Sequence, residues 1–188
     1  MLKRGFKSWS ENVALAFRRE LGQDKTSPLC PKALAKHLKI QLLTPSELQG
    51  LSETDLKNLL QSESDTWSAV TITNGLAHII IYNSSHSTSR QSNNIMHELA
   101  HIIIGHKPPQ NTFSQETGIF LRHYDQTQEE EADCLAAILL LPRDVLFKIK
   151  FSKSHIQYAA REYGVSKKLL EMRLNTSGIN YIYKRSNR

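Results

Sequence analysis

The sequence predicts an α+β fold in which a small antiparallel sheet carries a histidine-containing helix on one face. Residues 67–73 and 76–82 are rich in β-branched and apolar side chains, and an Asn-Gly pair between them is a strong hairpin signal. A polar stretch then leads into the apolar run 95–105, which contains two histidines. Residues 128–141 have the composition of another buried helix. Helices that follow a small sheet can cover one of its faces.

Two histidines four residues apart make the run 95–105 a candidate metal-binding helix. His97 and His101 lie on the same face of an α-helix, where both imidazoles can bind a single Zn²⁺. Glu98 stands one residue further round the helix, close enough to act on a water molecule at that metal. Gly105 ends the apolar run in a manner typical of a helix C-terminus. Because buried imidazole nitrogens need partners, a shared metal ion explains this pattern best.

The chain ahead of the hairpin is predicted to be mainly helical. Ser10 is the expected N-cap of the first helix, and Pro31 opens the second. Ser52 and Asp55 form a weak capping signal. The expected elements are helices over 11–21 and 32–39, a short strand over 40–43, and helical pieces over 45–51 and 52–60.

After the candidate metal-binding helix, the chain is expected to form a long connection and then a helical C-terminal part. The connection 107–127 has few apolar residues, and a loop of that length is usually functional or mobile. Pro142 ends the next helix, so residues 1–142 are interpreted as the core and 143–188 as a basic helical part packed on it. The remaining expected elements are short helices over 145–149, 155–163 and 167–174, and a short strand or frayed end over 175–188.

A third metal ligand is needed, because catalytic zinc sites use three protein ligands and keep one position open. An acidic stretch begins the helix that ends at Pro142. Glu129 and Asp133 share a helix face, so Glu129 can bind the metal while Asp133 accepts a hydrogen bond from the outer nitrogen of a ligating histidine. The residues alone leave Glu130 and Glu131 open as ligands, although both are expected to point elsewhere.

His106 follows the predicted end of the metal-binding helix. It lies five residues after His101, so a continued helix would turn it away from the two histidines. His106 is therefore expected to stay outside the site.

The composition is that of an ordinary globular protein with an uneven charge distribution. The 188 residues are 39% apolar and 22% charged, and the apolar stretch 135–141 is far too short to cross a membrane. Two cysteines and no apolar segment after the basic start predict a cytoplasmic protein with reduced thiols. Residues 143–188 hold 11 Lys and Arg against 3 Asp and Glu, which fits a nucleic acid, an acidic partner or a solvated surface.

Between about residues 30 and 178, the ordered set of motifs resembles the ImmA/IrrE-type metallopeptidases. The pattern of that family is H-E-x-x-H, then E-x-x-A-(N/D), then an alanine-rich helix ending in Leu-Leu-Met-Pro, where Leu141 replaces the methionine here. The main matching residues are His97, Glu98, His101, Glu129, Ala132, Asp133, Ala136, Ala137, Leu139, Leu140 and Pro142. Weaker matches lie at Leu34, Ala35, Leu38, Ile40, residues 79–83, Ser89, Arg90, residues 163–166, Arg173 and Leu174.

The resemblance implies a zincin-like fold and a zinc-dependent endopeptidase. His97, His101 and Glu129 would bind one Zn²⁺, with Mn²⁺ or another divalent ion as an alternative, and Glu98 would be the catalytic acid and base. Family members with assigned roles cleave helix-turn-helix repressors of stress-response or mobile-element genes. The implied partner is therefore a repressor protein, and no membrane is implied.

Peptide hydrolysis also needs a donor for the developing oxyanion besides the metal. Arg122, His123 and Tyr124 lie in the connection just before the acidic helix and are the candidates for an oxyanion or substrate contact.

A function of another class is suggested by the C-terminal part. Residues 159–173 resemble a helix-turn-helix, and with the basic charge of this region they favour a DNA-binding or partner-binding regulator as the alternative. In that case the peptidase site would be inactive or secondary. An inactive member that binds its partner without cutting it is a third reading.

Overall fold

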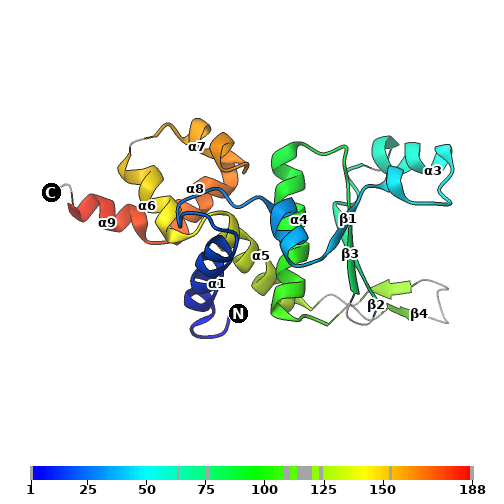
Figure 1. The fold of residues 1–188 in the computed structure, drawn as a ribbon, viewed down its shortest axis with the longest axis horizontal. Helices are drawn as coiled ribbons and strands as arrows, with labels where there is room; N and C mark the ends of the chain where they lie inside the picture. Colours follow the sequence, from blue (N-terminus) through cyan, green and yellow to red (C-terminus); the bar gives the residue numbers. More distant parts are fainter. Residues whose placement is uncertain are drawn as a thin grey trace.

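The computed structural model describes a mainly helical α+β protein with a small three-stranded sheet beside its central helix (Figure 1). It describes residues 2–62, 64–74, 77–107, 111–113, 120–122, 125–152 and 154–186. Ahead of the hairpin lie α1 (Phe6–Glu20), α2 (Pro31–His37), β1 (Gln41–Leu43), the 3₁₀-helix η1 (Pro45–Glu47), α3 (Glu53–Lys57) and the π-helix η2 (Asn58–Ser62). The hairpin strands are β2 (Ala69–Asn74) and β3 (Ala77–Tyr82), and the helix after them is α4 (Thr88–Ile104).

The three-stranded sheet has the order β1-β3-β2 and is mixed. The predicted hairpin is confirmed, because β2 pairs antiparallel with β3, with Val70 opposite Ile81. The prediction of a wholly antiparallel sheet was wrong, because β1 pairs parallel with β3, with Leu42 opposite Ile80. Local sequence signals indicate hairpins, whereas a parallel partner arrives through a long crossover. Within the described residues, β2 is an edge strand.

The first helix begins earlier than predicted. α1 starts at Phe6, after Gly5 in the left-handed conformation (φ 88°). Ser10 is therefore not an N-cap, and its buried hydroxyl donates a hydrogen bond to the carbonyl of Phe6 at 2.9 Å. The cap at Ser52 is confirmed, because its hydroxyl accepts a hydrogen bond from the amide of Asp55.

Helix α4 lies between the three-stranded sheet and helix α1 (Figure 1). Ser87 caps its first turn by accepting a hydrogen bond from the amide of Arg90, and Gly105 ends it with φ 78°. The apolar face of α4 is buried against the sheet, α2 and the later helix α5 (Gln126–Leu140). The predicted helix and its glycine stop are thus confirmed.

The long connection after α4 is not entirely without regular structure. It contains the strands β4 (Asn111–Phe113) and β5 (Phe120–Arg122), which pair antiparallel as a separate two-stranded sheet. Helix α5 (Gln126–Leu140) follows, and its N-cap Asp125 accepts hydrogen bonds from the amides of Thr127 and Gln128. Those two hydrogen bonds lower the pKa of the Asp125 carboxyl, because they stabilise its charged form.

The C-terminal part is helical to its last described residues. It comprises α6 (Arg143–Phe151), α7 (Ile156–Glu162), α8 (Lys167–Thr176) and α9 (Ile179–Ser186). The expected strand or frayed end after residue 175 was wrong, because α9 packs on α6 and buries Ile179. The division of the chain at residue 142 stays a prediction. None of the helices in the described ranges is long and apolar enough to cross a membrane.

Two arginines hold the C-terminal end of α5. Arg18 of α1 is fully buried and donates to the carbonyl of Leu140 at 3.4 Å. Arg173 of α8 donates to the carbonyl of Leu141 at 2.9 Å and pairs with Glu11 at 3.1 Å. Burial lowers the pKa of Arg18 to about 10, which still leaves the guanidinium charged at neutral pH. The two cations therefore satisfy carbonyls that a helix end leaves free, at its negative end.

We expect Arg173→Met to lower the free energy of unfolding by about 3 kcal/mol, because it leaves the Leu141 carbonyl and the Glu11 carboxylate without their buried partner. Urea denaturation measures this change. Arg161→Met, at an exposed position on α7, is the matched control and should change stability by less than about 0.5 kcal/mol. Equal losses in the two variants would contradict the role given to Arg173.

Candidate metal centre

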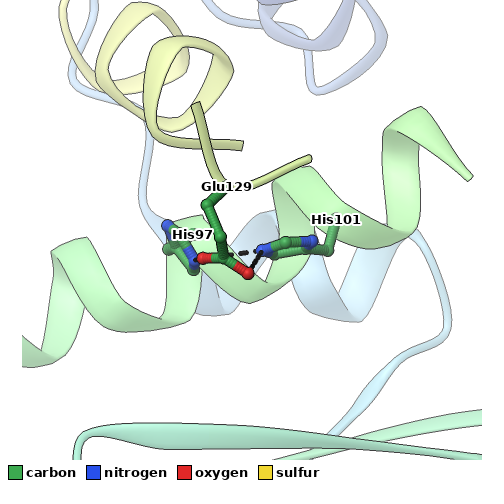
Figure 2. Close-up of side chains that lie close together, drawn as sticks. All are labelled: His97, His101 and Glu129. Atoms are coloured by element: carbon green, nitrogen blue, oxygen red, sulfur yellow. Dashed lines mark hydrogen bonds and ion pairs between the residues drawn. The ribbon is translucent and has the colours of Figure 1, made fainter. Parts of the chain in front are cut away.

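Two helices bring three metal-binding side chains together. His97 and His101 lie on one face of α4, and Glu129 reaches them from the first turn of α5 (Figure 2). The Nε2 atoms of the two histidines are 3.0 Å apart. Glu129 places Oε2 3.2 Å from His97 Nε2 and Oε1 3.6 Å from His101 Nε2. One carboxylate thus faces both imidazoles from the opposite helix.

The three donors fit a tetrahedral zinc site. Bonds of about 2.0–2.1 Å at tetrahedral angles place ligand atoms about 3.3 Å apart. The two Nε2 atoms are 3.0 Å apart, one Glu129 oxygen lies 3.2 Å from His97 and the other lies 3.6 Å from His101. One ligand atom from each residue can be chosen so that all three lie within 4.8 Å of one another. Two imidazole nitrogens and one carboxylate also match the ligand types that zinc enzymes use. The side chains of His97, His101 and Glu129 are 22%, 20% and 35% exposed, so solvent reaches the group.

Asp133 orients His97 from the next turn of α5. Its Oδ1 lies 2.9 Å from His97 Nδ1, on the side of the ring away from Glu129. Burial by itself lowers the pKa of His97, but the hydrogen bond and charge of Asp133, together with Glu98 and Glu129, outweigh it and raise that pKa. The Asp133 carboxylate therefore favours a proton on Nδ1, which leaves Nε2 as the metal-binding nitrogen.

Glu98 faces the sheet side of the site. Its carboxylate accepts a short hydrogen bond from the hydroxyl of Thr71 on β2. It also lines a cleft of about 420 Å³. The lining residues are Thr66, Trp67, Ser68, Ala69, Asn93, Asn94, His97, Glu98 and Asp133. A carboxylate beside the metal group and open to a cleft is placed to exchange protons with a bound substrate.

His106 belongs to the surroundings of the metal group, which the sequence interpretation did not expect. Its Nδ1 lies 2.9 Å from His101 Nδ1, and its Nε2 lies 3.1 Å from Glu131 Oε2. The left-handed turn at Gly105 reverses the chain, and the amide of His106 donates to the carbonyl of His101 at 3.0 Å. Helical periodicity stops at that glycine, so the angle assumed for His106 did not apply. The sequence feature that could have indicated this position is a histidine directly after a predicted glycine stop.

The structure describes only one of the three residues proposed for an oxyanion or substrate contact. The backbone of Arg122 forms the end of β5, opposite Asn111 of β4. His123 and Tyr124 lie outside the described residues. A contact of these three residues with substrate therefore stays a prediction.

A helix with H-E-x-x-H and an acidic donor from a second helix is the ligand arrangement of a class of zinc peptidases. A family model described as IrrE N-terminal-like domain, peptidase M78, matches residues 52–175. The match covers well over half of the chain, from α3 to α8, and the protein belongs to this family. The resemblance seen in the motifs is thereby confirmed. No curated protein matches the chain.

We expect saturating Zn²⁺ to raise the thermal unfolding midpoint of the metal-free protein by roughly 5–10 °C, because binding at 100 times Kd adds about 2.7 kcal/mol to the native state. Glu129→Gln should abolish most of this rise, since an amide is a poor zinc ligand. Glu130→Gln changes the neighbouring residue on the same helix and should keep the rise. The outcome that would refute Glu129 as a ligand is an equal rise in both variants, measured by scanning calorimetry.

Proposed function

We propose that this protein is a zinc-dependent endopeptidase. The observation that carries the proposal is the convergence of His97, His101 and Glu129 from two helices, with Glu98 beside them on a cleft. Membership in a peptidase family supports the same reaction class.

The proposed mechanism assigns proton transfer to Glu98. His97, His101 and Glu129 would hold the Zn²⁺ ion, which would supply the Lewis acidity that activates water and polarises the scissile carbonyl. Glu98 accepts a proton from the attacking water and delivers it to the nitrogen of the leaving amine. The hydroxyl of Thr71 holds the Glu98 carboxylate toward β2, so its orientation does not depend on substrate.

We further propose that the substrate binds as an extended peptide along β2. The cleft runs over residues 66–69, which lead into that edge strand, and Asn93 and Asn94 of α4 form its other side. A free strand edge offers backbone hydrogen bonds to an extended peptide, and the asparagine side chains add donors and acceptors. The polar lining suits a peptide backbone better than an apolar ligand.

The proposed substrate is a helix-turn-helix repressor. Support comes from the likeness of the motif set to ImmA/IrrE-type peptidases. The proposed cleft takes an extended chain. A folded repressor would therefore have to unfold locally at the cleaved bond before that segment could enter the cleft.

Glu98→Gln should retain zinc but lose peptidase activity by at least about 100-fold, since the amide cannot accept the proton from water. The measurement is cleavage of purified helix-turn-helix repressors from the same genome, followed by mass spectrometry, with zinc and with a chelator. Glu171→Gln, on the exposed surface of α8, is the matched control and should cleave normally. Undiminished cleavage by Glu98→Gln would overturn the proposed mechanism. If the wild-type protein cleaves none of the repressors, the proposed substrate class is wrong.

A further inference from the structure

A buried chain of polar groups leads away from His101 on the side opposite Glu129. His101 Nδ1 meets His106 Nδ1 at 2.9 Å, and His106 Nε2 meets Glu131 Oε2 at 3.1 Å. The side chains of His106 and Glu131 are each 7% exposed. Lys3 of the N-terminal segment pairs with Glu131, with its Nζ 3.9 Å from Glu131 Oε1.

Metal binding at His101 determines where each proton in this chain must lie. His101 Nε2 faces His97 and Glu129, so it is the nitrogen that must be free of a proton. Nδ1 of His101 then carries the proton and donates to His106 Nδ1, which must be bare. His106 consequently carries its proton on Nε2 and donates to the carboxylate of Glu131. With His101 and His106 both neutral imidazoles and Glu131 ionised, this is the arrangement in which the three groups are compatible with a metal at His101 Nε2.

We propose that His106 and Glu131 are positioning residues that fix the tautomer and ring orientation of His101 for metal binding. This inference rests on the proposed metal site. His106 is not itself a fourth ligand, because the nitrogen nearest His101 faces Nδ1 and the described metal group comprises His97, His101 and Glu129. We call the chain Glu131–His106–His101 the relay. In it, the buried carboxylate of Glu131 orients the ligand His101 through the imidazole of His106.

The two ligand histidines are therefore oriented by different means. His97 contacts Asp133 directly, and the Asp133 side chain is 75% exposed. His101 is connected to Glu131 through His106, and the side chains of His106 and Glu131 are buried. The backbone supports this arrangement, because the left-handed turn at Gly105 places His106 beside the last turn of α4.

His106→Phe tests the relay by removing the acceptor for His101 Nδ1 while keeping a ring. We expect it to weaken zinc affinity roughly 10–100-fold, measured by competition with a chromophoric chelator. His106→Asn keeps an acceptor oxygen near the position of Nδ1 and should restore affinity to within a few-fold of wild type. His37→Phe, at the end of α2, is the matched control, because His37 pairs with Glu20 and is not part of the metal group, and it should leave affinity unchanged.

A second measurement does not depend on loaded enzyme. Long-range ¹H–¹⁵N NMR of the metal-free protein reports which nitrogen of each histidine is protonated, and we expect His101 to carry its proton on Nδ1 and His106 on Nε2. Glu131→Gln keeps the side-chain volume, and its amide can donate to His106 Nε2, so it should yield mixed tautomers at both histidines. This variant tests the relay even if His106→Phe fails to fold.

The relay is overturned if His106→Phe is folded and binds zinc within twofold of wild type, or if His101 in wild type carries its proton on Nε2. A wild-type protein that binds no zinc overturns the proposed function instead. In that case an Nδ1 proton on His101, lost in His106→Phe, still supports the tautomer relay. The two failures are thus distinguishable.

Discussion

The packing of α5 against α4 is the constraint on which the candidate site depends. Ala100 on α4 and Ala132 and Ala136 on α5 are almost fully buried, and such small side chains let two helices approach closely. This approach sets Glu129 opposite the histidine pair. Successive residues on a helix differ by about 100° in direction, so a shift of one residue along α5 would point Glu129 away and put Gln128 or Glu130 in its place.

Both ends of α5 are secured by polar contacts that the ligands themselves do not make. Asp125 caps the amides at its start, and Arg18 and Arg173 bind the carbonyls at its end. The position of Glu129 along the helix axis therefore depends on helices α1 and α8, which contribute no side chain to the site. All three metal-binding candidates stand on helices, and helices hold side chains more accurately than loops do.

The site has an open side and a sealed side. Toward the sheet, Glu98 and His97 line a polar cleft beside the edge strand β2. Toward the end of α4, His106 and Glu131 are buried behind His101. In the proposed peptidase, exposure on one side would admit a peptide, whereas burial on the other would strengthen the hydrogen bonds proposed to orient His101. On these proposals, the fold separates the access of substrate from the support of the metal ligand His101.

The sequence by itself determined the helix of the histidine pair, the hairpin before it and the acidic helix, because helical spacing, an Asn-Gly turn and a glycine stop are local signals. It also determined the family, through the order of its motifs. Only the tertiary structure decided that β1 joins the sheet in parallel, that Glu129 faces both imidazoles, and that His106 and Glu131 stand behind His101. Those facts depend on how distant segments pack and on a chain reversal at Gly105, and neither follows from the periodicity of a single element.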